Sequence, residues 1–579
     1  MESPEMPVEH IDVLVVGGGP AGLITAYQLA RNLDRSKYRI KIIEKHVKSS
    51  QDQYGRAITL FPRSSEMLEQ LGLADSLAQQ CFACRKTANY DQHGNEIKGR
   101  GWAFMQNMKD TKWDFALVLR QKYQEDVFRT AMKKEGVELQ APYTLVDIQV
   151  PQDVKPCGYR ILATIEHSET KDQSMLKCRY LIGADGGKSF VRRTLNIPFD
   201  GTSTEDKWIR IDGVLETNHP KPRTYCAIES PTHGNVLERQ KAYDEFTQDA
   251  AEKKAIEAVK PFSIRFKQVD WWTIYVVGQR IARSFFVHDC IFLVGDACHT
   301  HSSGAAQGMN TGIHDAVNLA WKLSLVLKGV AYPHILNSYE AERLPNVQRL
   351  IKYDKGIARL MTMQLPEGWK GDPGADPNEV LGMVMAEVAE FNSGLGIFYE
   401  GDGYLNVGTC TEGMAHVSRA VRAGHRAPDI ELTKPGTWEG TRLLAQTPNF
   451  AGFYVLVFTG EVEGSRKYLR EFVGALGRVP WLSGGEVPMS WITVISRRGM
   501  SSAYEALGGM MPFGRVFYDE DGSALARYGV DKEKGGVFVL RPDGWVGMVL
   551  ALDGSAGEKL EGYFAKFLVG VGDRMVARL

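Results

Sequence analysis

The sequence is poor in cysteine, has no excess of charge of either sign, and has no uninterrupted apolar run of membrane-spanning length. Its 579 residues include 8 cysteines, too few for the disulfide framework of a small secreted protein. Lys and Arg total 69 and Asp and Glu total 70, so the net charge of −1 excludes a chain-wide basic field for nucleic acid. We therefore predict that the protein does not bind nucleic acid.

The longest run without a charged residue, residues 13–30, is interrupted by glycine and proline between Gly17 and Gly22. A membrane-spanning helix seldom contains such a break, so we expect no stable membrane insertion. The first twelve residues are acidic and polar, unlike a signal peptide. We expect a cytoplasmic protein, with the peroxisome as the alternative, because Ala577-Arg578-Leu579 is similar to the Ser-Lys-Leu address.

Two patterns suggest a metal or redox centre, and both are incomplete. Cys81 and Cys84 have the C-x-x-C spacing, but no second such pair exists to complete a zinc site. His299 and His301 have no third ligand at a suitable spacing. We therefore predict no metal site.

Glycine, by contrast, is abundant, with 59 residues against 24 prolines. This excess indicates tight turns, or places where the backbone closely approaches another group. With 44% hydrophobic and 24% charged residues, the composition is that of an ordinary globular protein, and the length predicts three or four domains.

The first strong motif lies near the N-terminus, where a strand of buried type, residues 11–16, leads into Gly17-Gly18-Gly19-Pro20-Ala21-Gly22. A helix is predicted from Leu23 to Arg31, and a second strand, residues 38–43, is followed by Glu44. A G-x-G-x-x-G sequence between a strand and a helix, with an acidic residue about 20 residues later, is typical of a dinucleotide site.

Each residue of this motif has a physical role. Gly17 allows the tight turn, Gly19 lets the backbone approach a pyrophosphate, and Gly22 lets the helix pack closely on the strand. The helix N-terminus offers free N–H groups and a partial positive charge to the phosphates. We expect Glu44 to accept hydrogen bonds from an adenosine ribose. The motif by itself does not separate FAD from NAD.

Two further motifs follow along the chain. A strand ending at Gly183 leads into Ala184-Asp185-Gly186-Gly187, a glycine-rich turn around one carboxylate. Another apolar strand, residues 291–294, leads into Gly295-Asp296-Ala297-Cys298-His299, and Gly308-Met309-Asn310 opens a helix soon afterwards. Each motif thus places one carboxylate directly after a buried strand.

In this combination the three motifs resemble those of the FAD-dependent aromatic hydroxylases, which are single-component flavoprotein monooxygenases. The resemblance covers residues 11–350 and is strongest with the phenol-hydroxylase-like branch. The segments that resemble this branch are Gly295-Asp296-Ala297-Cys298-His299-Thr300-His301-Ser302, Gly55-Arg56-Ala57 with the helix after it, and residues 270–280.

The resemblance implies FAD as cofactor and NADPH or NADH as co-substrate, which would bind without a domain of its own. Asp296 would hold the ribityl chain, and Asp185 would contribute to FAD and NAD(P)H binding. Other positions that match contacts to the flavin or its diphosphate are Arg56, Arg120, Gln121, Gly308, Met309 and Asn310. The alternatives are a helix cap for Asp296, a turn residue for Asp185, and a solvated helix start for Arg120 and Gln121.

The implied reaction is hydroxylation of a phenolic or polyketide-derived aromatic substrate with O₂, through a flavin hydroperoxide in a pocket that excludes water. Oxidative dearomatisation, epoxidation and Baeyer–Villiger insertion are alternatives on the same scaffold. A flavoprotein that has lost productive oxygenation, and a flavin dehydrogenase or oxidase, are further alternatives.

The sequence departs from the family at the substrate site. Ile58 stands where phenol hydroxylases have an aspartate, and a charged helix beginning near Glu238 replaces their strand with Arg and Tyr. The polar candidates that remain for catalysis are Tyr225, His233 and Arg239, with ordinary strand, turn and helix-start roles as alternatives. The aromatic residues expected to line the pocket, or else to lie in the core, are Trp208, Trp272 and Tyr275.

The expected fold class is α/β, with a Rossmann-type FAD-binding domain interrupted by a mixed-sheet substrate domain and followed by a thioredoxin-like α/β domain. We assign residues 1–190 and 281–362 to the FAD-binding domain and residues 191–280 to the substrate domain. Residues 363–423 form a linker and helical segment, and residues 424–579 the thioredoxin-like domain. Since no cysteine follows Cys410, this last domain has no thiol for redox chemistry. Its expected role is structural, in the contacts of a homodimer.

Overall fold

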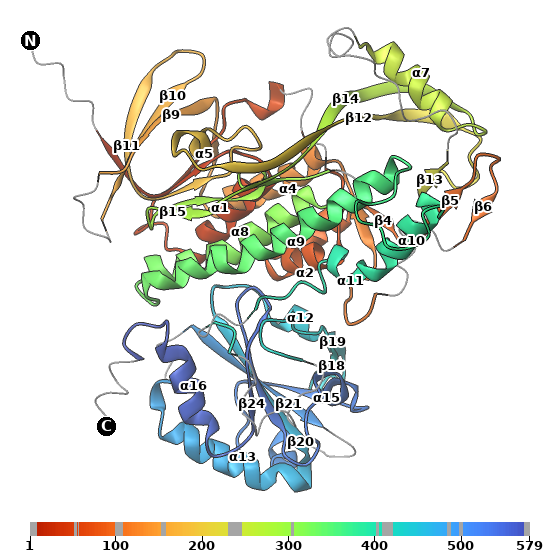
Figure 1. The fold of residues 1–579 in the computed structure, drawn as a ribbon. Coiled ribbons are helices and arrows are strands. Elements are labelled where there is room, and N and C mark those ends of the chain that lie inside the picture. Colours follow the sequence, from red (N-terminus) through yellow and green to blue (C-terminus); the bar gives the residue numbers. More distant parts are fainter. Residues whose placement is uncertain are drawn as a thin grey trace, which may run out of the picture.

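The computed structural model shows two parts, a larger one built on a central mixed sheet and a smaller C-terminal one below it in Figure 1. The structure describes residues 8–50, 55, 57–98, 108–151, 158–229, 246–302, 306–400, 405–407, 421–482, 488–496 and 502–571. Among these residues, no helix is both long enough and apolar enough to cross a membrane.

The central sheet has a parallel core with an antiparallel extension. Its strands lie in the order β15-β16-β11-β1-β2-β8, and β10 and β9 extend it beside β11. In β1, every residue from Ile11 onwards is buried, as expected for a parallel strand covered on both faces. The strands are β1 (Glu9–Val16), β2 (Ile40–Ile43), β8 (Leu139–Gln140), β9 (Tyr143–Gln149), β10 (Ile161–His167), β11 (Gln173–Gly183), β15 (Phe286–Val287) and β16 (Ile291–Leu293).

Three helices pack together beside this sheet. They are α1 (Pro20–Asn32), α4 (Gln121–Lys134) and α8 (Gly308–Leu327), and α1 contacts both of the others. Proline suits the first turn of α1, because the N–H that it lacks would have no helical partner there. In α8 every residue after Gly308 is buried, so this helix lies in the middle of the larger part.

A long antiparallel ribbon forms the upper arm of the molecule in Figure 1. β12 (Phe199–Thr217) and β14 (Ile264–Ala282) pair over most of their length, and β14 also pairs with the short β17 (His299–Thr300). The ribbon lies in the segment predicted as the substrate domain. Of the charged helix expected after residue 238, the described part is α7 (Gln248–Ala258), which contacts both long strands.

The pattern over residues 64–80 predicts one helix, but the structure divides it into α2 (Pro62–Gln70) and α3 (Ala74–Ala78). Gly72 lies between them with φ +75°, a left-handed conformation that ends a helix and suits glycine. Other short elements of the larger part are β3 (Thr59–Leu60), β4 (Phe82–Cys84), β5 (Thr87–Tyr90), β6 (Glu96–Ile97), β7 (Ala116–Val118), β13 (Tyr225–Ile228), α5 (Phe190–Thr194), η1 (Lys48–Ser50) and η3 (Gly295–Ala297).

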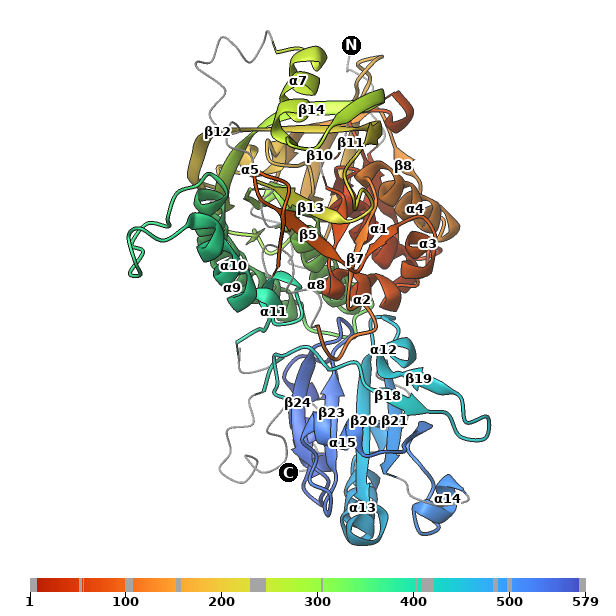
Figure 2. The ribbon, with the colours of Figure 1, turned by 90° about the vertical axis from the view of Figure 1, so that its right-hand side faces the viewer.

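The longest described helix, α9 (Asn337–Met361), follows the 3₁₀ turn η4 (Pro333–Leu336) and packs against α8. After it, α10 (Pro377–Glu387) and α11 (Ala389–Asn392) occupy the region predicted as a linker and helical segment. α10 packs back on α9. This segment therefore belongs to the larger part, as Figure 2 also shows.

The C-terminal part is a seven-stranded sheet in the order β19-β18-β22-β21-β20-β23-β24. β20, β21 and β22 are parallel, whereas β23 and β24 are antiparallel, and this mixture confirms the predicted α/β class. Its elements are β18 (Glu431–Thr433), β19 (Gly440–Arg442), α12 (Leu443–Gln446), β20 (Phe453–Glu461), α13 (Val462–Gly477), η5 (Pro480–Leu482), β21 (Met489–Ser496), α14 (Ala503–Ala506), β22 (Arg515–Asp519), α15 (Ser523–Tyr528), β23 (Gly536–Leu540), β24 (Val546–Ala551) and α16 (Ala556–Ala565).

A buried ionic network joins the two parts at the turn between β23 and β24. Arg541 in this turn pairs with Asp543 at 2.6 Å and with Glu342 on α9. Glu342 also accepts a hydrogen bond from Lys322 on α8, and the Trp321 indole donates to Asp543 at 3.1 Å. Burial lowers the pKa of Lys322 to about 8, although Glu342 opposes the shift. Two cations and two anions thus balance within the interface.

A second contact at the junction involves α2, which Figure 2 shows next to α12. The Arg63 guanidinium lies over the Trp545 ring at 4.2 Å and donates to the Asp543 carbonyl oxygen at 2.6 Å. Arg426 pairs with Glu66 at 2.9 Å. Because these groups are buried, the C-terminal part forms one packed body with the helices of the larger part.

We predict that Arg541→Ala lowers the stability of the whole chain. The substitution leaves the buried Glu342 and Asp543 carboxylates without their guanidinium, and removing one partner of a buried pair costs about 3–5 kcal/mol. Thermal unfolding followed by circular dichroism measures the loss. The exposed Arg515 offers the control, since Arg515→Ala should change stability by less than about 0.5 kcal/mol. Equal midpoints for both variants would contradict the structural role of the network.

Candidate active site

Of the three motif glycines in the turn after β1, Gly19 alone has open space beside its Cα atom. A Cβ atom on Gly17 would collide with the Ala184 carbonyl oxygen, and one on Gly22 would collide with the Gly17 carbonyl oxygen. A Cβ atom on Gly19 would meet no heavy atom within 4 Å. Gly17 and Gly22 are therefore required by packing, and the space at Gly19 fits the pyrophosphate of a dinucleotide.

The start of α1 is suited to an anion. Its N-cap residue is Gly19, which has no side chain to accept a hydrogen bond, and the first turn contains no acidic residue. Its first N–H groups are therefore free to bind phosphate oxygens. Glu44, at the end of β2, accepts a hydrogen bond from the Gly18 N–H at 2.7 Å. This contact holds the carboxylate beside the turn, where the proposed ribose contact requires it.

Asp185 has one carboxylate oxygen in use and one free. Oδ2 accepts hydrogen bonds from the Phe190 and Val191 N–H groups at 2.6 and 3.1 Å, at the start of α5. Oδ1 is buried and has no hydrogen-bond partner within the described part of the chain. A buried, unsatisfied oxygen is costly unless a ligand or water pairs with it, so Asp185 fits a cofactor contact in addition to its capping role.

Asp296 lies in the 3₁₀ turn η3, directly after β16, and its side chain is exposed while both neighbours are buried. Gly295 has φ +61°, which turns the chain sharply at the end of the strand. Arg192 fixes this turn from the other motif, because its guanidinium donates to the Ala297 carbonyl oxygen at 2.7 Å and to the Gly187 carbonyl oxygen at 2.9 Å. The second and third motifs are thus held against each other.

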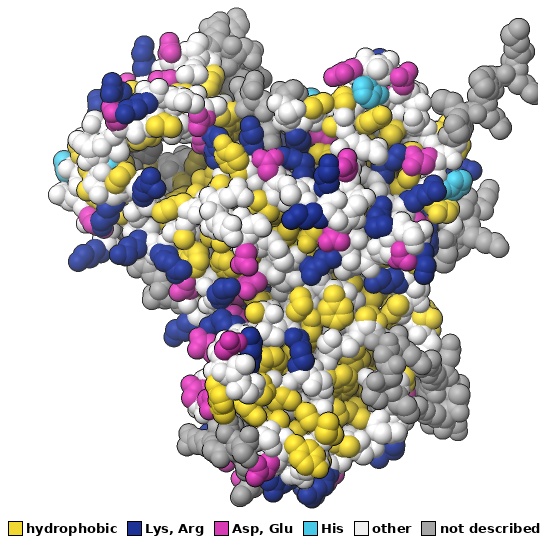
Figure 3. All heavy atoms as spheres, turned by 180° about the vertical axis from the view of Figure 1, so that it is seen from behind, with side chains coloured by type: hydrophobic (Ala, Val, Ile, Leu, Met, Phe, Trp, Pro, Cys, Tyr) yellow, Lys and Arg dark blue, Asp and Glu magenta, His cyan; other side chains and the backbone are white. Residues whose placement is uncertain are grey.

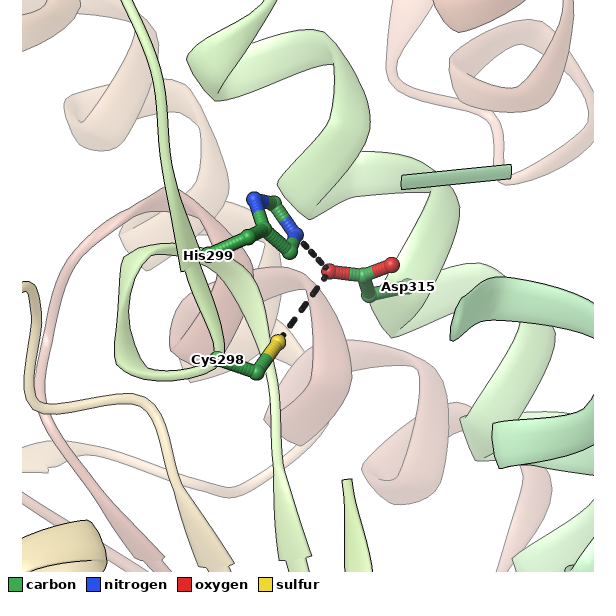
Figure 4. Close-up of side chains that lie close together, drawn as sticks. All are labelled: Cys298, His299 and Asp315. Atoms are coloured by element: carbon green, nitrogen blue, oxygen red, sulfur yellow. Dashed lines mark hydrogen bonds and ion pairs between the residues drawn. The ribbon is translucent and has the colours of Figure 1, made fainter. Parts of the chain in front are cut away.

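Asp315 on α8 holds the same turn in place, and its carboxylate points toward Cys298 and His299 (Figure 4). Its Oδ2 accepts hydrogen bonds from the Gly295 N–H at 3.0 Å and from His299 Nε2 at 2.8 Å, and the Cys298 thiol lies 3.9 Å away. Its Oδ1 pairs with Arg343 at 2.8 Å. Burial alone would raise the pKa of the Asp315 carboxyl, but Arg343 and His299 outweigh burial and hold it well below its ordinary value.

The group Cys298, His299 and Asp315 is compact enough to hold a metal ion. Its hydrogen bonding argues for another role. Burial and the adjacent Asp315 raise the pKa of the Cys298 thiol well above its ordinary value, so the thiolate that metals bind is disfavoured. The Arg343 guanidinium already supplies the cation that balances the carboxylate. We therefore interpret the group as a hydrogen-bonded anchor, and the absence of a metal site stays a prediction.

The start of α8 is a second open helix N-terminus. Its N-cap residue is Gln307, whose side chain makes no capping hydrogen bond, and no cap of the Gly308, Met309 and Asn310 N–H groups occurs within the described residues. The Asn310 side chain is fully used within the protein, since Oδ1 accepts from the Phe61 N–H at 2.9 Å and Nδ2 donates to the Thr59 carbonyl oxygen at 3.0 Å. Any flavin contact of Asn310 would therefore use its backbone, and the helix dipole would favour negative charge there.

The structure places the remaining cofactor candidates at the start of α4. Gln121 accepts a hydrogen bond from the Ala57 N–H at 3.3 Å, so it lies beside the segment that contains Arg56. Arg120 pairs with Asp270 on β14 at 3.1 Å and donates to the Tyr123 hydroxyl at 3.1 Å. Arg56 itself lies outside the described residues. The assigned flavin and diphosphate contacts of all three stay predictions.

Tyr225 is the described member of the three predicted catalytic residues, and His233 and Arg239 lie outside the described part. Tyr225 begins β13 and packs against a small apolar cluster that is separate from the main core. The members of this substrate cluster are Phe61, Cys84, Met108, Ala116, Val118, Tyr225, Ala306, Ile357, Leu381, Val384, Met385 and Ala389. Ala306 connects it to the helix start, because Gln307 is the N-cap of α8.

The three aromatic residues expected to line the pocket do not share one face of the ribbon. Trp208 lies opposite Tyr275, and Trp272 lies opposite Ile211. Trp208 and Ile211 are three residues apart on β12, an odd number. Because side chains alternate along a strand, Trp208 and Trp272 are on opposite faces. Trp272 contacts Phe246, just before α7, at a ring distance of 6.2 Å. The Tyr275 side chain lies outside the described atoms.

Sequence reasoning missed the residues that define the site by packing. Ile357 and Met385 lie on α9 and α10, Phe61 directly precedes α2, and nothing in their local sequence distinguishes them from core residues. Asp315 lies in the predicted helix after Asn310, and an acidic residue within this largely apolar helix could have suggested a buried charge. Asp354 on α9 also contacts the loop after His299, without any motif around it.

We predict that Asp296→Ala weakens FAD binding without unfolding the protein. The side chain is exposed, so its loss leaves the fold intact, while one charge-assisted hydrogen bond to the ribityl chain disappears. Such a bond corresponds to about a tenfold or greater rise in the dissociation constant. Fluorescence titration of the apoprotein with FAD measures it, with Asp249→Ala on α7 as the control. An unchanged FAD affinity in Asp296→Ala would place the ribityl contact elsewhere.

Comparison with known proteins places the chain among flavin enzymes. It is 26% identical to phenol 2-monooxygenase from Aspergillus fumigatus over 94% of each chain. It is 28% identical to 3-hydroxybenzoate 4-monooxygenase from Comamonas testosteroni, over 96% of this chain and 95% of the relative. Among solved structures, aklavinone-11 hydroxylase in complex with FAD and aklavinone has the same fold, with a TM-score of 0.70 and 21% identity, covering 96% of this chain and 99% of the other.

Two family models match the chain. The FAD binding domain model matches residues 10–354, more than half of the chain, and the model of the phenol hydroxylase C-terminal dimerisation domain matches residues 503–571. The first range contains all three cofactor motifs described above, and the second lies in the seven-stranded C-terminal part. The chain therefore belongs to the FAD-dependent aromatic hydroxylases with a phenol-hydroxylase-type C-terminal domain, and it is an FAD-dependent monooxygenase.

Proposed function

We propose that the enzyme uses NAD(P)H and O₂ to hydroxylate a phenolic or polyketide-derived aromatic compound that binds in the substrate cluster. The observation that supports this most directly is the position of that cluster. It is apolar, it contains the Tyr225 ring, and it includes Ala306, which directly precedes the N-cap of α8. An aromatic substrate in the cluster would therefore lie next to the helix start assigned to the flavin.

FAD, when bound, supplies the transfer of electrons from NAD(P)H to O₂ and so the activated oxygen. The chain's own residues supply the surroundings. Phe61, Ile357 and Met385 exclude water, which otherwise diverts activated oxygen to hydrogen peroxide. The free N–H groups at the start of α8 favour negative charge on the adjacent ring system. The Tyr225 hydroxyl is the phenol group of the cluster and is assigned to the substrate hydroxyl.

This assignment gives Tyr225 the part that a carboxylate would otherwise have. Ile58 provides no acceptor for a phenol proton, so the substrate oxygen depends on a neutral hydrogen-bonding group. A phenol hydroxyl both donates and accepts, and it can hold the substrate hydroxyl while its proton leaves. We assign Tyr225 to orientation of the substrate ring and stabilisation of its developing negative charge.

We also propose that the enzyme is a homodimer formed through the C-terminal part. Within residues 503–571, Met511 is 76% exposed and Tyr504 is 56% exposed. The same C-terminal part contains a cluster of Phe472, Trp491 and Phe513, whose ring centroids lie 5.3 to 6.3 Å apart. Figure 3 shows apolar side chains gathered over the C-terminal half of one face. A large apolar surface of this kind is typical of a protein interface.

The cytoplasm is the location that we propose for the enzyme. This proposal rests on the scarcity of cysteine, with 8 in 579 residues, and on the free thiols of the described cysteines, and the peroxisome remains the alternative because of Ala577-Arg578-Leu579. These last three residues lie outside the described part of the structure.

We expect the purified enzyme with FAD to form hydroxylated product from members of a phenol and polyketide-aromatic panel, with NAD(P)H consumed and ¹⁸O incorporated from ¹⁸O₂. Tyr225→Phe should lower kcat/KM by about tenfold, the value of one hydrogen bond that strengthens in the transition state, with unchanged FAD affinity. Tyr159→Phe, at an exposed tyrosine outside both the substrate cluster and the C-terminal part, is the matched control.

Two results would contradict this function. NAD(P)H oxidation that yields only hydrogen peroxide with every compound would support a flavoprotein without productive oxygenation. Product containing oxygen from water instead of O₂ would exclude a monooxygenase reaction. Full activity of Tyr225→Phe would remove Tyr225 from the assignment but leave the reaction standing.

We expect Met511→Asp to dissociate the dimer. A charge placed on the apolar surface must be desolvated in the interface, which opposes association. Sedimentation equilibrium should give twice the chain mass for the wild type and the single chain mass for the variant. Met363→Asp changes an exposed methionine of the larger part and should leave the mass unchanged. A monomeric wild type would refute the proposal.

A further inference from the structure

Asp354, a buried carboxylate outside the sequence motifs, binds Ser302 in the segment before α8, the helix whose start is assigned to the flavin. Asp354 lies on α9 and is fully buried. Its Oδ2 accepts hydrogen bonds from the Ser302 N–H and from Gln279 Nε2, both at 2.7 Å, and its Oδ1 accepts from the Ser302 hydroxyl at 2.5 Å. The three donors belong to two different segments, the loop after β17 and the strand β14.

All three donors are neutral groups, which distinguishes this carboxylate from those of Asp315 and Glu342. Asp315 and Glu342 are paired with Arg343 and Arg541, whereas no ion pair to Asp354 occurs within the described residues. A buried carboxylate is expensive to desolvate, and only strong, well-aligned hydrogen bonds offset the cost. The position of Ser302 and Gln279 is therefore tightly constrained by Asp354.

Asp354 lies near the substrate cluster along α9 and contacts the segment after β17 that contains Ser302. One turn further along α9, Ile357 packs in the substrate cluster with Ala306. Gln279 is on β14, seven residues from Trp272. Because this number is odd, the two side chains lie on opposite faces of the ribbon. Ser302 follows β17 and precedes the N-cap of α8 at Gln307. A single carboxylate thus contacts both the ribbon and the loop.

We propose that Asp354 is a positioning residue for oxygenation. Through its hydrogen bonds to Ser302 and Gln279, it holds Ser302, which precedes α8, at a fixed position relative to the β12–β14 ribbon. This inference rests on the proposed function. A substrate in the substrate cluster, beside Ile357, would be held at a defined distance from the start of α8 only while the hydrogen bonds of Asp354 to Ser302 and to Gln279 are both intact. Loss of either contact should loosen this position, so that NAD(P)H is still consumed but oxygen is lost as hydrogen peroxide.

The test compares Asp354→Asn, Gln279→Leu and the double variant, with Lys355→Ala as the control on the exposed side of α9. Two quantities are measured: the dissociation constant of FAD, and the product formed per NAD(P)H oxidised. We expect each single variant to lower product per NAD(P)H at least about threefold, with hydrogen peroxide rising to match, and the double variant to be no worse than the worse single. Lys355→Ala should match the wild type in both.

Gln279→Leu keeps the carboxylate and both Ser302 bonds, so it provides the test if Asp354→Asn fails to fold. Additive effects in the double variant, or an equal loss of NAD(P)H oxidation and product, would overturn the proposal, since both indicate independent structural damage. If the wild type forms no product with any compound, the proposed function fails. The flavin absorption spectrum then still tests Asp354, because an unchanged spectrum and FAD affinity in both single variants would refute its effect on the segment before α8.

Discussion

The arrangement of the larger part depends on the burial of one carboxylate, that of Asp315. An anion without solvent must be matched by a cation and by several hydrogen-bond donors, or it destabilises the fold. Arg343 on α9, His299 in the loop and the Gly295 N–H in the turn after β16 supply these partners. Satisfying one charge therefore fixes α8, α9 and the turn that presents Asp296 in a single relative position. The exposed side chain of Asp296 owes its orientation to buried groups on α8, on α9 and in the loop.

The same two helices satisfy a second set of buried charges, about two turns further along α8 and at the neighbouring residue of α9. Lys322 on α8 and Glu342 on α9 are matched by Arg541 and Asp543 from the C-terminal sheet. With neither anion nor cation in excess, the junction is stable only when both parts are folded and in contact. This gives the C-terminal domain a physical role that needs no thiol. It completes the charge balance of α9 and of α8, the helix whose N-terminal end was assigned to the flavin.

The sequence predicted best where a function depends on residues that are neighbours in the chain. The turn with Gly17, Gly19 and Gly22 is a local structure, and its role follows from steric limits that hold in any fold. The substrate site could not be predicted in this way. Phe61, Ile357 and Met385 meet only because α2, α9 and α10 converge. Trp208 and Trp272 have the same chemistry, yet the strand register places them on opposite faces, and the bulges that set this register have no clear sequence signal.

The segment predicted as a linker is the clearest example of tertiary context overriding composition. Its glycine, proline and aspartate content is typical of a connection between domains, but the helices after it close the site. Met385 on α10 packs in the substrate cluster, and the Asn392 carbonyl oxygen accepts a hydrogen bond from Gln307, the N-cap of α8, at 2.6 Å. This segment packs in the substrate cluster and against the start of α8, and it lies outside the central sheet. Differences in substrate between members of this family would then arise in α10 and α11 as readily as in the ribbon.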